Sequence, residues 1–222
     1  MEVINVSKKA GLIVKRIIDL ITSVFGLGLL SPFFLLIAMA IKIDSPGPVF
    51  YRQERIGKNG VPFRVFKFRS MVVGADKMGL GLAVAKDDPR ITRVGKWLRR
   101  YSLDELPQLI NVVRGEMSIV GPRPTIRQQV EQYDAFQRRR LNMKPGITGW
   151  AQVNGRNSIS WEERIELDVW YVDHWSLWLD AKIMALTIPK LLTSSSEELY
   201  GRDGVTPDLG DPQSNSGPPL CG

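Results

Sequence analysis

The longest uninterrupted run of hydrophobic positions lies near the start of the chain, from Leu20 to Ile41, where no charged residue occurs. A run of about 20 apolar residues is long enough to cross the hydrocarbon core of a bilayer. Ser31-Pro32 interrupts it near its centre, and a proline there bends or breaks a helix because it removes a backbone donor. The Ser31 hydroxyl can satisfy a carbonyl that loses its donor. The pattern predicts a Pro-broken membrane helix.

Basic residues flank this segment on both sides: Lys8, Lys9, Lys15 and Arg16 precede it, and Lys42, Arg52, Arg55 and Lys58 follow it. Such clusters mark the cytoplasmic side of a membrane. A simple crossing would leave one cluster outside, whereas a re-entrant helix that turns at Ser31-Pro32 and leaves on the same side keeps both inside. Asp19, near the surface, is then tolerated.

Two other interpretations of the segment stay open. A Pro-kinked transmembrane anchor has the same composition. Ala38-Met39-Ala40 resembles a signal-peptidase site, but the apolar run is longer than the roughly 7 to 15 residues of a signal-peptide core, which disfavours secretion. Cys221 is the only cysteine, so an intrachain disulfide is excluded and a reducing cytoplasmic setting is favoured.

Polar and apolar residues alternate after this segment. Val49-Phe50-Tyr51 and the stretch from Phe63 to Phe68 flank Lys58-Asn59-Gly60, and Asn-Gly is a strong signal for a β-hairpin. Lys67 and Arg69 would sit on its second strand. They can face a phosphate, or they can simply keep a strand edge soluble, and the sequence does not choose between these roles.

Helical periodicity dominates the distal half, with helices expected over Ser102 to Val113, Ser160 to Trp175 and Ser176 to Leu192. Tryptophans and a tyrosine cluster in the last two, which is typical of amphipathic helices lying at a membrane interface. Gly74 to Asp88 reads as a surface loop. The expected fold is therefore helix-rich α+β and monotopic, with a membrane segment at 1–48, a domain at 49–193 and a disordered tail at 194–222.

The formal net charge of +7 and the pI near 9.6 imply an anionic partner: nucleic acid, a lipid head group or a phosphorylated small molecule. His174 is the only histidine, which excludes Ser-His-Asp chemistry and zinc sites with several histidines. Charge alone does not select the partner.

Adjacent carboxylates at Asp104 and Glu105 are the first candidate for chemistry. Ser102 and Glu105 have the spacing of a helix capping box, which would make both acids structural. Arginines stand nearby, however, and adjacent carboxylates suit a hard cation such as Mg²⁺ that also binds phosphates. An ionised Asp104 could attack phosphorus and form an acyl phosphate.

A rigid segment, Gly121-Pro122-Arg123-Pro124, is the second candidate. Its prolines fix φ on both sides of Arg123, so the guanidinium has fewer conformations to lose when it meets a phosphate. A rigid turn with a solvated arginine is the alternative.

Asp168 and Asp180 each interrupt the apolar face of a predicted helix. A carboxylate on an inward face is costly unless it is paired with a cation or a metal. Both acids are therefore candidates for a site, and structural ion pairs with arginines remain equally open.

A set of motifs stands together in this chain: Ser31-Pro32, Phe66-Lys67-Phe68-Arg69-Ser70-Met71, Ser102-Leu103-Asp104-Glu105-Leu106-Pro107-Gln108, Val120-Gly121-Pro122-Arg123-Pro124 and Pro145-Gly146-Ile147-Thr148-Gly149-Trp150. The combination is highly specific, although no single motif is. From about Lys15 to Leu192 the chain resembles the bacterial sugar transferase family, the small monotopic phosphoglycosyl transferases.

The resemblance implies a re-entrant helix, a catalytic domain at the cytoplasmic face of the bacterial inner membrane and an Asp-Glu dyad with Mg²⁺. It implies transfer of a sugar 1-phosphate from a nucleotide diphosphate sugar, by family expectation a UDP-sugar, to polyprenyl phosphate, with release of nucleoside monophosphate. This is the first membrane step in assembling exopolysaccharide, lipopolysaccharide or another glycoconjugate.

By motif position, Asp104 resembles the family's nucleophile and Glu105 resembles the second acid of the dyad. The resemblance implies that both carboxylates bind Mg²⁺. Substrate-binding positions implied by the same motifs are Lys67, Arg69, Arg99, Pro122, Arg123, Asp168 and Asp180. A non-catalytic adaptor that binds anionic lipid explains the charge but not the combined motifs, and nucleic-acid binding would predict a strongly salt-dependent affinity. No spacing identifies the sugar, the nucleotide, the lipid length or the oligomeric state.

Overall fold

The computed structural model describes residues 6–79, 81 and 83–193. The tail expected at 194–222 lies outside these residues. The described chain combines one long N-terminal helix with two small two-stranded sheets and a helical distal half, as the expected helix-rich α+β class requires.

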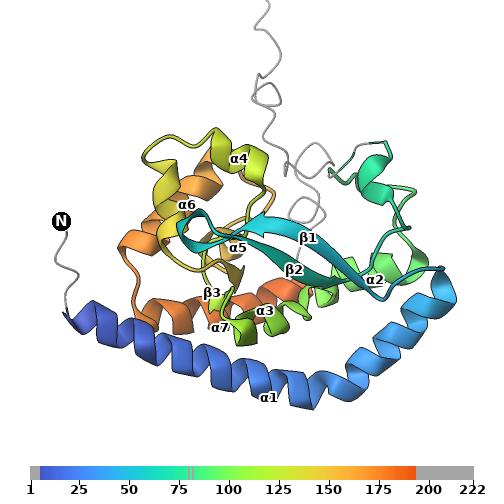
Figure 1. Ribbon diagram of the computed structural model, residues 1–222, viewed down its shortest axis with the longest axis horizontal. Helices are drawn as coiled ribbons and strands as arrows, with labels where there is room; N and C mark the ends of the chain where they lie inside the picture. Colours follow the sequence, from blue (N-terminus) through green and yellow to red (C-terminus); the bar gives the residue numbers. More distant parts are fainter. Residues whose placement is uncertain (1–5, 80, 82, 194–222) are drawn as a thin grey trace, which may run out of the picture.

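The helix α1 runs from Val6 to Asp44 with Pro32 inside it. The Ser31 hydroxyl donates to the Gly28 carbonyl at 2.8 Å, and this is the carbonyl that Pro32 leaves without its usual donor. Figure 1 shows the result as a helix that is bent, not broken, which corrects the expected break. By length and composition, the stretch Lys8–Asp44 is long and apolar enough to cross a membrane.

The predicted hairpin is present. Strand β1, Phe50–Ile56, pairs antiparallel with β2, Pro62–Phe68. Asn59 and Gly60 in the connection have φ values of 58° and 79°, the left-handed conformations that an Asn-Gly turn accommodates. The buried face of β2 packs against α3, Gln108–Arg114, where the buried Asn111 amide bonds the backbone of both Phe66 and Arg64.

A second sheet joins two of the motifs. Strand β3, Ser118–Val120, pairs in parallel with β4, Gly146–Thr148, a pairing that the hydrophobic pattern does not predict. A Cβ on Gly121 would lie 2.3 Å from the Lys144 carbonyl oxygen, and one on Gly146 would lie 2.1 Å from the Gly121 nitrogen. Only glycine therefore permits this approach, which holds the Arg123 segment against the segment around Pro145.

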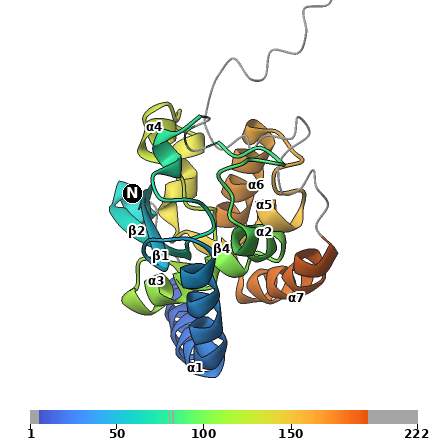
Figure 2. The same cartoon turned by 90° about the vertical axis from the view of Figure 1, so that its right-hand side faces the viewer.

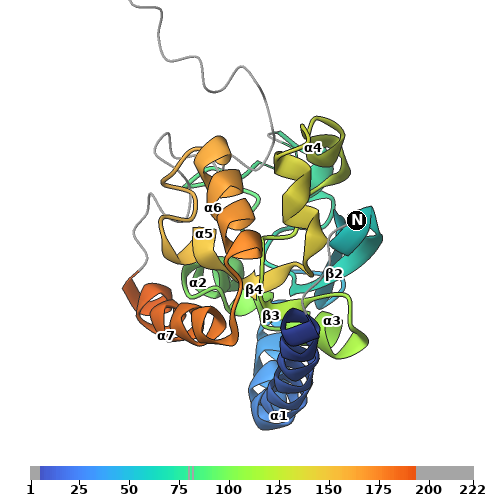
Figure 3. The ribbon, with the colours of Figure 1, turned by 90° about the vertical axis from the view of Figure 1, so that its left-hand side faces the viewer.

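The helical part also contains α2, Arg93–Arg100, α4, Arg127–Glu131, α5, Trp150–Val153, α6, Trp161–Asp173, and α7, Leu177–Thr193. The last two confirm the predicted helices, and Ser160 with Glu163 forms a complete capping box at the start of α6. A buried cluster around Tyr171, Val120 and Ile183 joins α6, α7 and β3. Figures 2 and 3 show α1 and α7 along the same edge of the molecule.

Charged residues of α1 connect it to the rest of the fold. Buried Lys15 donates to Asp180 of α7 at 2.7 Å and to the Val120 carbonyl at 2.9 Å. Asp19 accepts from the Ser118 hydroxyl at 2.7 Å and from the Ile119 amide at 3.0 Å. These contacts fix the first arm of α1 against β3, immediately before the Arg123 segment.

Candidate active site

The Asp104-Glu105 dyad does not lie in the expected helix. A 3-10 turn, Leu103–Glu105, precedes Pro107 and α3, so the helix predicted over Ser102 to Val113 is divided. Ser102 has φ 54°, and among the described residues its side chain makes no capping hydrogen bond, which makes the predicted capping box wrong. Its hydroxyl instead accepts from the Arg156 guanidinium at 3.2 Å. The carboxylates of Asp104 and Glu105 therefore do not form part of a capping box at this turn.

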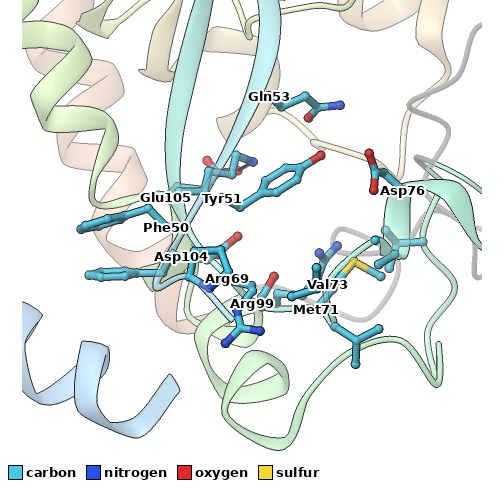
Figure 4. A pocket seen from close by; sticks show the side chains of 18 of the residues that line it. Phe50, Tyr51, Gln53, Arg69, Met71, Val73, Asp76, Arg99, Asp104 and Glu105 are labelled. Carbon is cyan, nitrogen blue, oxygen red and sulfur yellow. Dashed lines mark hydrogen bonds and ion pairs between the residues drawn. The ribbon is translucent and has the colours of Figure 1, made fainter. Parts of the chain in front are cut away.

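Both carboxylates line a pocket of about 230 Å³ (Figure 4). Its walls come from β1, the end of β2, the segment after it as far as Val84, and the dyad turn. Tyr51 points across the pocket toward the segment that carries Asp76. The cations that line it are Arg55, Lys67, Arg69, Arg99, Arg123 and Arg156. A pocket with this excess of cations is suited to an anionic ligand.

Glu105 is held by two cations at one oxygen. Lys67 Nζ lies 2.9 Å and Arg123 Nη2 lies 3.1 Å from its Oε1. Burial by itself raises the pKa of Glu105, but Arg123, Lys67 and Arg156 together outweigh burial and bring that pKa well below its ordinary value. Glu105 is therefore a fixed anion that orients Lys67 and Arg123.

Asp104 differs from its neighbour. Asp104 is 8% exposed, and among the described residues no hydrogen bond or ion pair is made by its carboxylate. Burial raises its pKa; Lys67 and Arg99 oppose this, and the Glu105 charge adds to it, so the pKa lies above the ordinary value. A poorly solvated carboxylate without a hydrogen-bond partner is a better nucleophile than a paired one once it is ionised.

The pocket brings the dyad together with Lys67, Arg99 and Arg123. The other candidate residues make different contacts. Arg69 lines the pocket, but its guanidinium donates to the carbonyls of Ser45 and Pro46, at the end of α1. Pro122 supplies a carbonyl that accepts from the Gly146 amide at 2.8 Å. Ser31 and Pro32 shape the bend of α1.

The two distal acids, Asp168 and Asp180, lie in different surroundings. Asp168 is 1% exposed, pairs with Arg140, and lines a smaller cavity of about 30 Å³ that shares Arg123 and Arg156 with the main pocket. Burial raises its pKa despite that partner. Asp180 lines neither cavity; it accepts from Lys15, from the Tyr171 hydroxyl and from the Trp175 indole. The sequence left open an ion pair with an arginine for each acid: Asp168 has one, with Arg140, whereas the partner of Asp180 is Lys15.

Comparison with known proteins identifies the family. The sequence profile of the bacterial sugar transferase family matches residues 10–194. This chain belongs to the bacterial sugar transferase family. It is 46% identical over 183 residues to the uncharacterized sugar transferase EpsL of Bacillus subtilis (strain 168), covering 82% of this chain and 89% of that protein.

Longer relatives match through part of their length. The chain is 47% identical over 186 residues to the UDP-glucose:undecaprenyl-phosphate glucose-1-phosphate transferase of Escherichia coli (strain K12), covering 80% of this chain but 40% of that protein. It is 41% identical over 194 residues to the exopolysaccharide production protein ExoY of Rhizobium meliloti (strain 1021), covering 81% and 86%. The chain thus spans most of the short relatives and less than half of that longer one.

The donor set of this family member fits Mg²⁺. Two adjacent carboxylates line one pocket, and Mg²⁺ in phosphate enzymes typically takes one or two carboxylates, with substrate phosphates and water completing an octahedron. Among the described residues no cluster of three or more His, Cys, Asp or Glu side chains could hold a metal ion by itself. A cation here would therefore depend on the substrate for its remaining ligands.

Sequence reasoning missed Arg156 as a residue of this family site. It lines the pocket, has φ 56°, and its positive charge lowers the pKa of both Asp104 and Glu105. Burial lowers the pKa of Arg156 itself, as do the neighbouring arginines. The one available signal was the Asn154-Gly155 turn directly before it, which is typical of a loop.

Proposed function

We propose that this protein transfers a sugar 1-phosphate from a nucleotide diphosphate sugar to polyprenyl phosphate, the first membrane step in assembling an exopolysaccharide or another glycoconjugate. The observation that carries the proposal is the cation-lined pocket in which Asp104, which accepts no hydrogen bond from the described residues, lies beside a Glu105 held by Lys67 and Arg123. The names of relatives at 46% and 47% identity, which specify glucose phosphotransferase activity on undecaprenyl phosphate, support the same reaction.

In the first step, an ionised Asp104 oxygen attacks the phosphorus that carries the sugar. The bond from that phosphorus to the bridging oxygen breaks, and nucleoside monophosphate leaves with the bonding electrons. The product is an aspartyl phosphosugar. Arg123, Arg99 and Arg156 stabilise the charge that develops on the phosphate oxygens. Mg²⁺, held by Asp104 and Glu105, would supply further neutralisation of that charge.

In the second step, an oxygen of the lipid phosphate attacks the same phosphorus and the Asp104 carboxylate leaves. One pyrophosphate linkage replaces another, so the acyl phosphate only has to conserve transfer potential between the two steps. The order of events is ping-pong. A UDP-sugar is the donor favoured by the relatives whose names specify UDP-glucose.

The proposed location is inferred from α1. Its apolar residues and the basic clusters on both sides support a re-entrant helix that places the catalytic pocket at the cytoplasmic face of the membrane. Such a location gives the pocket a soluble donor from one side and a lipid acceptor from the other.

The test is direct. After incubation with UDP-glucose and Mg²⁺ and without lipid acceptor, peptide mass spectrometry should find a phosphohexose adduct on Asp104. Asp104→Asn keeps the side-chain volume, so it should remain folded and form no adduct. Glu105→Gln is the matched control: it should slow the reaction while any adduct still maps to Asp104. An adduct on Glu105, or full turnover by Asp104→Asn, would refute the mechanism.

A further inference from the structure

A second concavity lies outside the catalytic pocket, between the second arm of α1 and α2. It has a volume of about 480 Å³. Its lining is almost entirely apolar, with a single arginine, and consists of Phe33, Leu36, Ile37, Ala40, Arg93, Val94 and Trp97. We call this concavity the α1–α2 groove.

The groove opens on the part of the molecule expected in the bilayer. Leu36 is 59% exposed and Trp97 is 47% exposed, although both are large apolar side chains. Trp97 packs edge-on against Phe33 of the membrane helix, with ring centroids 6.5 Å apart, and against Tyr101 at 5.9 Å. The wall is thus a set of aromatic and aliphatic side chains beside a membrane helix, which suits a hydrocarbon ligand.

The positive charge of α2 indicates that the hydrocarbon ligand carries an anionic group. This helix carries Arg93, Lys96, Arg99 and Arg100 and no acidic residue. Arg93 lines the groove, whereas Arg99, less than two turns further along the same helix, lines the catalytic pocket. One short helix therefore connects an apolar groove to the phosphate-binding pocket. A molecule with an anionic phosphate at the end of an apolar chain matches both ends of this arrangement.

We propose that the α1–α2 groove holds the phosphate-proximal isoprene units of the polyprenyl phosphate acceptor, with Trp97 as the main contact, while the phosphate reaches Arg99 and Asp104. The inference rests on the proposed function, because it assigns that reaction's acceptor to a surface. Ordinary membrane acyl chains would contact the same side chains but carry no phosphate for the pocket. They are the alternative that an experiment must separate.

Trp97→Ala and Trp178→Ala form a matched pair of variants. Trp178 of α7 is also an exposed apolar residue, at 79% exposure, but it does not line the groove. Two quantities are measured in detergent micelles: the burst of UMP from UDP-glucose without acceptor, and the KM for polyprenyl phosphates of long and short chain. The burst reports only the first step, so it also shows that a variant is folded and competent.

Trp97→Ala should keep the burst and raise the KM for the long-chain acceptor by about tenfold, the effect of losing part of one buried aromatic contact. It should also reduce the preference for the long chain over the short one. Trp97→Phe should restore most of the affinity, and Ala40→Trp, which fills the groove from α1, should raise the same KM. Trp178→Ala should change neither quantity.

Equal effects of Trp97→Ala and Trp178→Ala on the KM would overturn the inference and point to general membrane contact. An unchanged KM in both Trp97→Ala and Ala40→Trp would overturn it too. If Trp97→Ala loses the burst, Trp97→Phe and Ala40→Trp decide the result in the same way. A wild-type protein that gives no burst with any nucleotide sugar would instead refute the proposed function on which the inference rests.

Discussion

At the residue scale, two neighbouring carboxylates have opposite electrostatic environments. Two cations contact one oxygen of Glu105 and its pKa falls, whereas Asp104 is buried without a hydrogen-bond partner among the described residues and its pKa rises. The difference arises because the 3-10 turn directs only one of them at Lys67 and Arg123. In the proposed mechanism Asp104 reacts as a carboxylate, so kcat/KM should rise with pH through the pKa of Asp104.

Replacing Lys67 tests that electrostatic account. Lys67 is the cation that most strongly lowers the pKa of Asp104, so Lys67→Gln should raise this pKa further and move the acid limb of the kcat/KM profile to higher pH. Arg64→Gln, an exposed cation on the same strand, is the control and should leave the limb in place. The measurement is the pH dependence of UMP release; an acid limb that does not move would contradict the role of Lys67.

At the element scale, a buried ion pair organises the segment that forms one wall of the pocket. Arg90 donates to both Asp88 oxygens and to the carbonyls of Ala75, Met78, Gly81 and Ala83. Hydrogen bonds from Arg90 lower the pKa of Asp88 to about 2. One arginine thus satisfies a set of carbonyls that a sheet or helix would otherwise serve.

Asp88→Asn should reduce the stability of this segment at neutral pH. A carboxyl whose pKa falls on folding contributes stability that is present above its unfolded pKa, near 3.9, and lost as the pH falls toward 2. The contribution is about 2 kcal/mol at pH 7. Hydrogen exchange of residues 74–91 should show it, with the difference from wild type shrinking below pH 4. Asp87→Asn, at the exposed neighbour, should have little effect; equal effects of the two variants would refute the prediction.

At the scale of the whole molecule, α1 is joined to the domain by buried charges. Lys15 and Asp180 are each less than a tenth exposed and lie 2.7 Å apart, although they are 165 positions apart in the chain. This pair connects the membrane helix to α7 next to β3, which leads directly into the Arg123 segment. The position of Arg123 therefore depends on how α1 packs against the domain.

Asp180→Asn should destabilise the protein by about 3–5 kcal/mol, because it leaves Lys15 buried without its counter-ion. Thermal unfolding in micelles measures the effect. Asp173→Asn, which breaks the exposed pair with Arg139, should cost less than about 1 kcal/mol. Loss of turnover by Asp180→Asn without any loss of stability would instead assign Asp180 to the chemistry.

The topology of α1 gives the last prediction. In a Cys221→Ser background, Lys8→Cys and Lys58→Cys should react with a membrane-impermeant thiol reagent from the same side of sealed vesicles, because the bend at Pro32 allows both ends to return to that side. Pro32→Leu should straighten the helix and favour a spanning form. Reaction of the two cysteines from opposite sides would establish a Pro-kinked transmembrane anchor.

Features that depend on local residue chemistry can be predicted from the amino-acid sequence. The apolar run predicted the long N-terminal helix, although the break expected at Ser31-Pro32 is only a bend. Asn59-Gly60 predicted the hairpin, and the spacing around Ser160 and Ser176 predicted the last two helices. The adjacent acids Asp104 and Glu105 and the rigid Arg123 segment were identified as candidate site residues because their residue types suit phosphate chemistry.

Features that depend on contacts between distant residues could not be predicted, because they arise from packing in the folded chain. The β3–β4 pairing, the turn at Ser102, the recruitment of Arg156 and the different surroundings of Asp168 and Asp180 rest on residues far apart in the chain. A carboxylate on an apolar helix face predicts an ion pair with a cation, since burying an unpaired carboxylate is costly. Packing sets which cation forms this pair, and for Asp180 the cation is Lys15 of α1.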